Sequence, residues 1–346
     1  MYAANYARNK TLIKGLRQNG VQVVECNVKA HFFWGFRYYH LLKRFLEVGT
    51  KTDIIFVGFP GQTDVPLAWI LGKIFHKKVV FDAFISLYNS LVFDRKNFGE
   101  KNWRAKFWWF IDWLSCSLAD RVILDTNEHI KYFVRTFRLP KKKFIRVLVG
   151  TDTDIFFPRK VKPHQGFHVG FHGSYLPLQG VDIIIETAKL LRKYKEIRFN
   201  LLGNGLERQK IEGLINKYQL NNVKLFDPVA YEKLPDFMSS NNIYLGGHFG
   251  VNVKSRMVIP NKVYEAMATE KATIVGDSNA TKELFENNVQ CLLVKQGDPK
   301  SLATAILKLK KSTLFREKIA IGGYNLISSY LTPKMIAVAL LKDLSL

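Results

Sequence analysis

Short runs of β-branched and aromatic residues alternate with longer stretches of helical periodicity along this chain of 346 residues. In the first half, the runs lie at 21–26, 53–59, 78–84, 121–124 and 144–149. In the second half, they lie at 167–173, 197–203, 222–227, 242–247, 272–276 and 289–294. Strands that alternate with helices pair in parallel. The pattern therefore predicts an α/β protein with two Rossmann-like, doubly wound sheets.

The polar, Pro- and Gly-containing segment Pro158–Gln165 separates the two series and reads as an interdomain linker. We expect an N-terminal domain over 1–160 and a C-terminal domain over 166–330, with a final helix over 333–346 that packs back onto the first domain. The first half opens with a loop and a helix instead of a buried strand. We expect the first strand of that domain to be missing, which a truncation, a misplaced start codon or a permuted sheet would each explain.

The charge balance points to an anionic partner, because 52 Lys and Arg face 29 Asp and Glu, a formal +23. Nucleic acid, an acidic membrane and phosphorylated substrates all fit this charge. The basic clusters are spread over both halves (Lys141–Lys143, Arg192–Lys195 and Lys308–Lys311). This spread does not favour nucleic acid, and it also fits a plain solvated surface.

We expect a cytoplasmic protein. Cys26, Cys116 and Cys291 have neither disulfide nor metal spacing, which favours a reducing compartment. The first residues lack the apolar core of a signal peptide, and no apolar run reaches the roughly 18 residues of a membrane span. Residues 103–124 come closest, but charges interrupt them, so they predict an amphipathic helix and a strand. The helix is rich in Trp and Phe, which favours a core position and leaves a role at a lipid interface open.

The most informative segment spans residues 246–268 and reads GGHFGVNVKSRMVIPNKVYEAMA. A Gly-rich strand end precedes Lys254 and Arg256, and Pro260 and Asn261 begin a helix. A helix N-terminus offers unpaired N–H groups and a positive dipole end, so a diphosphate can dock there beside these cations. Glu265, one turn further on, is placed to accept hydrogen bonds from ribose hydroxyls. A capped surface helix behind solvated basic residues is the alternative.

Glycine turns end two other predicted strands of the second half. Gly203 and Gly205 follow one strand, and Gly173, next to Ser174, ends another. A G-x-G turn alone is a weak signal. Ligands of open α/β sheets bind outside the carboxyl ends of the strands, so these turns and the 246–265 segment should meet at one crevice. In the first half, Asp82 ends a buried strand and could orient a hydroxyl group or cap the next loop.

The second half resembles the C-terminal domain of retaining family 4 glycosyltransferases. The matching stretches are VGFHGSYLPLQGVDIIIETAKLL, LLGNGLERQKIEGL, NVKLFDPVAYEKLPDFM, VIPNKVYEAMATEKATIVGDSNATKELF and CLLVKQGDPKSLATAI, which together cover roughly 150 residues. NYARNKTLIKGLRQNGVQVVE and DAFISLYNS carry a weaker similarity in the first half. The resemblance implies a GT-B fold with two domains facing across a cleft, a nucleotide-diphosphate sugar as donor, no metal ion, and transfer with retention.

The resemblance also assigns residues. Glu265 corresponds to the second acid of the family's paired-glutamate motif, whereas Met257 stands at the place of the first. Ser174 and Gln179 replace the usual Arg and Lys after the first strand of this domain, so Lys254, Arg256 and Lys262 are left to neutralise the diphosphate. The donor-binding set is Gly173, Ser174, Gly203, Gly205, Val229, Lys254, Arg256, Asn261, Lys262 and Glu265. Asn5 and Arg8 face the acceptor, and Asp82, Lys254 and Arg256 are the catalytic candidates.

Two other functions remain beside a hexosyltransferase of cell-surface polysaccharide or glycolipid synthesis, working on a saccharide or lipid-linked acceptor at an anionic membrane. A GT-B sugar-nucleotide epimerase would need acid–base carboxylates that the sequence does not show. A catalytically degenerate member would bind an anionic ligand without transfer. The D-x-D of Asp152 and Asp154 holds a metal in another class of glycosyltransferases, but a turn is the simpler interpretation, and no His shows zinc spacing.

Overall fold

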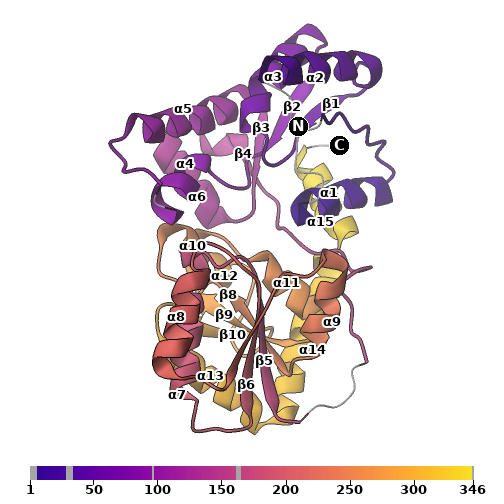
Figure 1. Ribbon diagram of the computed structural model, residues 1–346. Helices are drawn as coiled ribbons and strands as arrows, with labels where there is room; N and C mark the ends of the chain where they lie inside the picture. Colours follow the sequence, from indigo (N-terminus) through magenta and orange to yellow (C-terminus); the bar gives the residue numbers. More distant parts are fainter. Residues whose placement is uncertain (1–5, 29–33, 96, 161–164, 345–346) are drawn as a thin grey trace. The chain divides into compact units, whose positions relative to one another are not determined.

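The computed structural model describes residues 6–28, 34–95, 97–160 and 165–344, and its contacts divide the chain into two compact units (Figure 1). Unit 1 comprises Met1–Leu148 and Pro333–Leu346, and unit 2 comprises Val149–Thr332. The division lies before the linker that the sequence suggests, because residues 149–160 pack with unit 2. The Thr151 N–H donates to the Leu331 carbonyl over 3.2 Å, and the Phe156 and Tyr231 rings lie 5.2 Å apart.

Unit 1 contains a four-stranded parallel sheet in the order β1-β2-β3-β4. Its strands are β1 (Ile54–Val57), β2 (Lys78–Asp82), β3 (Arg121–Leu124) and β4 (Phe144–Arg146). Its longer helices are α1 (Ala7–Gln18), α2 (Trp34–Val48), α3 (Val65–Ile74), α5 (Trp103–Leu118), α6 (Asn127–Phe137) and α15 (Pro333–Leu344). Short turns of helix are η1 (Gln62–Asp64), α4 (Leu87–Asn89), the π-helix η2 (Ser90–Asp94) and η3 (Lys141–Lys143).

Four of the five strands predicted for the first half are confirmed, and the prediction of a strand at 21–26 is wrong. Residues 21–28 form no strand, although their composition is β-branched and their side chains partly alternate in burial. A strand needs a neighbour to receive its backbone hydrogen bonds. The edge strand β1 pairs with β2 on one side only, and no described segment pairs with its other side.

The C-terminal helix α15 packs against α1 within unit 1. Gly15 of α1 makes this close approach feasible, because a Cβ at that position would lie 1.9 Å from the Pro333 carbonyl oxygen. The Asn19 side-chain amide also donates to the Lys334 carbonyl over 3.0 Å. The two helices at the C-terminus, α14 and α15, separate next to Pro333, as the sequence predicts.

Unit 2 contains a six-stranded parallel sheet with strands β5 (Phe167–His172), β6 (Ile197–Leu202), β7 (Val223–Phe226), β8 (Ile243–Gly247), β9 (Ala272–Asp277) and β10 (Leu292–Lys295). Its helices are α7 (Val181–Leu190), α8 (Arg208–Tyr218), α9 (Leu234–Ser239), α10 (Val253–Met257), α11 (Asn261–Ala268), α12 (Asn279–Lys282), α13 (Pro299–Lys311) and α14 (Thr313–Tyr330). Two 3-10 turns, η4 (Pro177–Gln179) and η5 (Tyr231–Lys233), complete it. All six strands predicted for the second half are confirmed.

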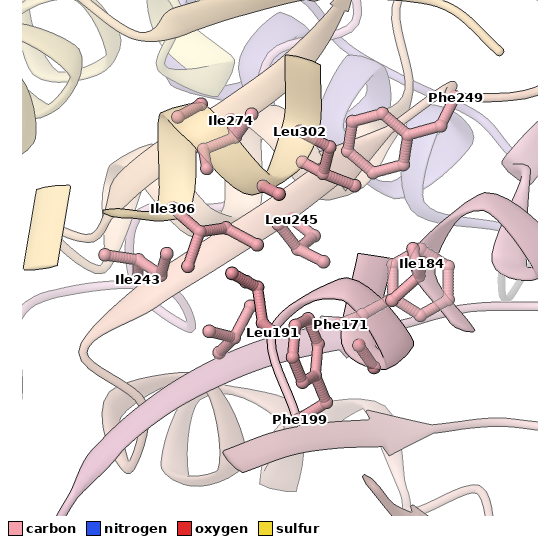
Figure 2. Packing of buried hydrophobic residues seen from close by; sticks show 14 of the residues in the cluster. Phe171, Ile184, Leu191, Phe199, Ile243, Leu245, Phe249, Ile274, Leu302 and Ile306 are labelled. Atoms are coloured by element: carbon pink, nitrogen blue, oxygen red, sulfur yellow. The ribbon is translucent and has the colours of Figure 1, made fainter. Parts of the chain in front are cut away.

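Helices cover both faces of this sheet, with α7, α8 and α13 on one face and α9, α11 and α14 on the other (Figure 1). Figure 2 shows Phe171 and Phe199 of the sheet and Leu302 and Ile306 of α13 as members of one buried hydrophobic cluster. Burying a side chain of this size stabilises a fold by roughly 1.5–3 kcal/mol. The α/β class with two doubly wound parallel sheets is therefore confirmed.

The strand order β10-β9-β8-β5-β6-β7 creates a topological switch point between β8 and β5. From β5 the chain builds outward through β6 and β7, and then returns to place β8 on the other side of β5. The two strands pair at Val169 with Ile243 and at Gly170 with Tyr244. A crevice for ligands forms at such a point, outside the carboxyl ends of the strands.

Among the described residues, no helix combines the length and the apolar character that crossing a bilayer requires.

Candidate functional site

Two glycine turns meet at the carboxyl ends of β5 and β6. Gly173 and Gly203 have φ values of 150° and 142°, which favour glycine. A Cβ on Gly203 would lie 1.9 Å from the Gly173 carbonyl oxygen, so the turns pack backbone against backbone. The Tyr175 N–H donates to the Asn204 carbonyl over 2.9 Å and ties the turns together. The convergence predicted from the sequence is therefore present for these glycines.

The buried ammonium group of Lys262 lies beside Gly173. A Cβ on Gly173 would lie 3.0 Å from Lys262 Nζ, and this nitrogen also lies 5.0 Å from the centre of the Phe171 ring. Nζ donates to the side-chain oxygen of Gln179. Burial lowers the pKa of Lys262 to about 7, against the opposing pull of Glu265. The hydrogen-bond partner is a neutral amide, so an anion beside Lys262 would favour its charged form.

Lys262 belongs to the first turn of α11, where a positive charge is unfavourable. Pro260 is the N-cap residue of α11, and it provides no side-chain cap. The first N–H groups of a helix and its dipole attract anions and repel cations. The dipole of α11 therefore disfavours the charged form of this buried lysine. A bound anion would compensate both the lysine charge and the unpaired N–H groups of the helix terminus.

Glu265, on the next turn of α11, lies in a row of polar side chains. Its Oε2 lies 3.1 Å from His172 Nε2, and Tyr231 Oη donates to its Oε1 over 3.4 Å. His172 Nδ1 lies 2.7 Å from Tyr244 Oη. Burial, with the charge of Glu265 second, raises the pKa values of Tyr231 and Tyr244, so both keep their hydroxyl protons. The row holds the Glu265 carboxylate at the end of β5.

The other two predicted cations lie on the short helix α10. Asn252 and Ser255 form a capping box that starts this helix. Gln296 fastens it to the strand end, because its side-chain amide donates to the carbonyls of His248 and Ser255, each over 3.0 Å. Lys254 is half-buried and Arg256 is exposed. Arg256 is therefore accessible to a ligand.

The remaining donor-side candidates border this region. Ser174 and Gly205 are exposed beside the glycine turns, Asn261 is half-buried at the start of α11, and Val229 is exposed before Tyr231. Asp152 and Asp154 form a turn in which the Asp154 N–H donates to Asp152 Oδ1 over 3.1 Å. Among the described residues, no group of three or more His, Cys, Asp or Glu is arranged to hold a metal ion.

In unit 1, Arg8 and Asp82 are fully buried and contact each other. Arg8 Nε donates to Asp82 Oδ2 over 2.7 Å, and Arg8 Nη1 donates to the Val147 carbonyl over 3.0 Å. Burial raises the pKa of Asp82, and the Arg8 charge opposes that shift. Asp125, which follows β3, approaches His129 Nδ1 to 2.7 Å nearby. The contacts of Arg8 and Asp82 are those of a buried ion pair, and their acceptor-side and catalytic roles stay predictions. Asn5 lies outside the described residues.

Sequence reasoning gave no functional role to several residues of this region. His172 ends β5, His248 directly follows β8, and Arg208 donates from α8 to the Gly203 carbonyl over 2.7 Å. The rule that ligands bind at strand ends could have found both histidines, because His172 precedes Gly173 and His248 lies in the 246–265 segment, both of which the rule selected. Gln179 was noted only as a replacement, yet it is the hydrogen-bond partner of Lys262.

The geometry suits a ligand that carries both anionic oxygens and hydroxyl groups. Lys262, Arg256 and the α11 N-terminus favour the anion, whereas the Glu265 carboxylate accepts from hydroxyls. A phosphorylated sugar compound combines the two kinds of group.

Comparisons with known proteins agree with this chemistry. The family model described as "Glycosyl transferases group 1" matches residues 152–326. An uncharacterized glycosyltransferase of Methanocaldococcus jannaschii is 24% identical over 160 residues, which are 44% of this chain and 41% of that protein. The lipopolysaccharide core biosynthesis glycosyltransferase LpsD of Rhizobium meliloti is 28% identical over 185 residues, 52% of this chain and 49% of that protein. The chain thus spans about half the length of the curated relatives that it matches.

Among solved structures, HepE of Anabaena in complex with UDP has a TM-score of 0.70 and 17% identity, over 95% of this chain and 88% of that one. The same protein has also been solved with UDP-glucose. This likeness over most of the chain shows the two-domain GT-B fold.

Proposed function

The chain belongs to the glycosyl transferases group 1 family, and on this premise we propose that it transfers a sugar from a nucleotide-diphosphate sugar to an acceptor hydroxyl. One observation carries the proposal: the Lys262 ammonium is buried at the N-terminus of α11 with a neutral hydrogen-bond partner, beside the turns at Gly173 and Gly203. A diphosphate is the ligand group that best compensates a cation and a helix terminus together.

In this proposal, the diphosphate docks at the start of α11, with Lys262 behind it and Lys254 and Arg256 on α10. Glu265 accepts from the ribose hydroxyls. Catalysis comes from positioning the acceptor and from stabilising the charge that develops on the departing diphosphate. Three cations and a helix terminus are available for that charge, and we therefore propose transfer without a required metal ion.

The finer assignments are also proposals. We propose transfer of a hexose with retention at the anomeric carbon, as in family 4, because the stretches that resemble that family run in order through unit 2. We expect proton NMR to show that the initial product, in which the sugar has passed to water or to an acceptor, has the same anomeric configuration as the donor. A product of opposite configuration would exclude retention.

Donor binding is tested first by thermal unfolding in the presence of UDP, GDP and their common sugar conjugates, because a ligand of the folded state raises Tm. We expect one nucleotide family to raise Tm, and Arg256→Ala or Glu265→Gln to remove most of that shift. Arg192→Ala is the matched control, since Arg192 is exposed beyond the end of α7, before β6 begins. Cooperative unfolding without a shift by any compound would refute the proposal. A shift without turnover would favour a binding protein that has lost transfer.

We also propose that the protein works on a lipid-linked or saccharide acceptor of cell-surface polysaccharide or glycolipid synthesis, at the cytoplasmic face of an anionic membrane. Helix α5 exposes Trp103 (70%), Phe107 (42%) and Phe110 (46%) at positions that share one face. The exposed basic residues Lys101, Arg104 and Lys106 lie among them. The neighbouring helix α3 exposes Trp69, Ile70 and Ile74 beside Lys73. Aromatic and basic side chains together suit an anionic lipid surface.

Flotation with vesicles tests this surface. We expect binding to vesicles of phosphatidylcholine with phosphatidylglycerol, weaker binding to phosphatidylcholine alone, and loss of binding in Trp103→Ser/Phe107→Ser. Leu314→Ser is the control, because Leu314 is an exposed apolar residue (80%) on α14 of unit 2. Equal flotation of both variants, or none for the unchanged protein, would exclude docking through α5.

A further inference from the structure

His248 directly follows β8, at the switch point of unit 2. Only 5% of the residue is exposed. Its carbonyl accepts from the Gln296 side chain over 3.0 Å, and a Cβ on Gly276 would lie 2.0 Å from that same oxygen. The backbone at His248 is therefore fixed from two sides, which gives the imidazole a defined position.

The two ring nitrogens of His248 have different surroundings. The imidazole makes a hydrogen bond to the backbone of Val258, whereas Nδ1 is buried without a partner among the described residues. A neutral imidazole has one N–H and one lone pair, and a backbone carbonyl can only accept. The proton therefore belongs on Nε2, and Nδ1 presents its lone pair. A buried polar atom without a partner is costly and calls for an explanation.

The charges around His248 keep this lone pair available. Burial lowers the pKa of His248 well below its usual range, and the ammonium groups of Lys262 and Lys254 lower it further. The imidazole thus stays neutral although it lies within electrostatic reach of both ammonium groups.

The kind of ligand group that can pair with His248 Nδ1 follows from the lone pair on this nitrogen and from the nearby ammonium groups. A phosphate oxygen cannot donate to Nδ1, but a hydroxyl group can. A nucleotide sugar brings hydroxyls and phosphates to one place.

We propose that His248 Nδ1 accepts a hydrogen bond from a hydroxyl of the donor's sugar. The inference rests on the proposed function, since it names the residue that recognises the transferred sugar rather than the nucleotide. It makes His248 a determinant of which sugar is bound.

The test compares each nucleotide sugar with its nucleoside diphosphate by calorimetry, with UDP and UDP-glucose as one pair and GDP and GDP-mannose as the other. His248→Gln keeps a donor for the Val258 carbonyl and removes the acceptor. We expect affinity for the nucleotide sugar to fall about threefold to tenfold, the size of one hydrogen bond, with the diphosphate unchanged. His248→Asn, whose amide oxygen can take the place of Nδ1, should retain the sugar's contribution.

A set of UDP-glucose or GDP-mannose analogues, each lacking one hydroxyl, identifies the contact. The unchanged protein should bind one analogue less tightly than the parent sugar, and His248→Phe should bind the two equally. Unchanged affinity for the diphosphate shows that each variant is folded. Equal losses for sugar and diphosphate, or no loss for either, would overturn the role of His248. If the unchanged protein bound no diphosphate and no nucleotide sugar, the proposed function itself would fail.

Discussion

Lys262 Nζ donates a hydrogen bond to the side-chain oxygen of Gln179, across 83 positions of sequence. Gln179 ends the 3-10 turn η4 after β5, and Lys262 lies in the first turn of α11 after β8. The bond thus joins the two sides of the switch point. Because the amide is neutral, Lys262 is held in place without its charge being compensated, and two consequences can be measured.

The first consequence is an unusual dependence of stability on pH. Burial lowers the pKa of Lys262 from 10.5 to about 7 in the folded protein. Between these values the unfolded chain binds more protons than the folded one, so stability rises with pH across this window and is lowest, and level, below it. We expect Lys262→Met to lose this slope. Each pKa unit corresponds to about 1.4 kcal/mol, so the difference from the unchanged protein should vary by a few kcal/mol.

Urea unfolding of the protein, followed by circular dichroism at several pH values between 6 and roughly 10, measures the effect. Lys300→Met is the control, since Lys300 is exposed in the first turn of α13. If the free energy of unfolding depends on pH in the same way in Lys262→Met and Lys300→Met, Lys262 titrates like a surface lysine and the prediction is wrong.

The second consequence is that a substitution at Gln179 should change stability and ligand affinity in opposite directions. A carboxylate in Gln179→Glu would pair with Lys262 and raise the lysine pKa, so we expect a higher Tm. The same carboxylate would compete with a diphosphate for the lysine, so affinity for UDP or GDP should fall tenfold or more, about 1.4 kcal/mol. Gln209→Glu, on the exposed face of α8, is the control and should change neither. A higher Tm with unchanged affinity would place the anion elsewhere.

Much of unit 2 and its edge could be predicted from the sequence, because local signals suffice there. β-branched runs mark the strands, Pro260 marks the start of α11, and glycines mark the strand ends, so the edge on which Gly173 and Gly203 meet could be predicted before any contact was known. The GT-B fold followed from the resemblance of the second half.

What could not be predicted depends on long-range contacts. Arg8 and Asp82 are 74 positions apart, and nothing near either residue indicates that they form a buried pair. The strand expected at 21–26 had the right composition but no neighbour to pair with. The sequence shows that His248 follows a strand end, but the burial of its ring and the contact with the Val258 backbone depend on the folded chain.

The contact between the glycine turns gives a sharp test of the site's geometry. Gly203→Ala would place a methyl group 1.9 Å from the Gly173 carbonyl oxygen at a φ of 142°, so the turns must separate. We expect a loss of roughly 2 kcal/mol or more in the free energy of unfolding, together with loss of nucleotide binding. Gly213→Ala is the matched control, because its Cβ would meet nothing within 4 Å. Ala is a better helix former than Gly, so this change in α8 should be neutral or stabilising. Similar unfolding midpoints for the two variants would contradict the close packing of the turns.

The buried pair of Arg8 and Asp82 can be tested separately, because all six tryptophans belong to unit 1, so their fluorescence follows that unit alone. Arg8→Met leaves the Asp82 carboxylate buried without its cation, and removing one member of such a pair typically costs about 3–5 kcal/mol. We expect the tryptophan-detected urea midpoint to fall sharply in this variant and to recover in Arg8→Met/Asp82→Leu, in which neither charge remains. Nucleotide affinity, which we assign to unit 2, should persist in both variants. A normal midpoint in Arg8→Met would show that the pair does not stabilise unit 1, and would return Arg8 and Asp82 to the acceptor-side and catalytic roles suggested by their positions in the sequence.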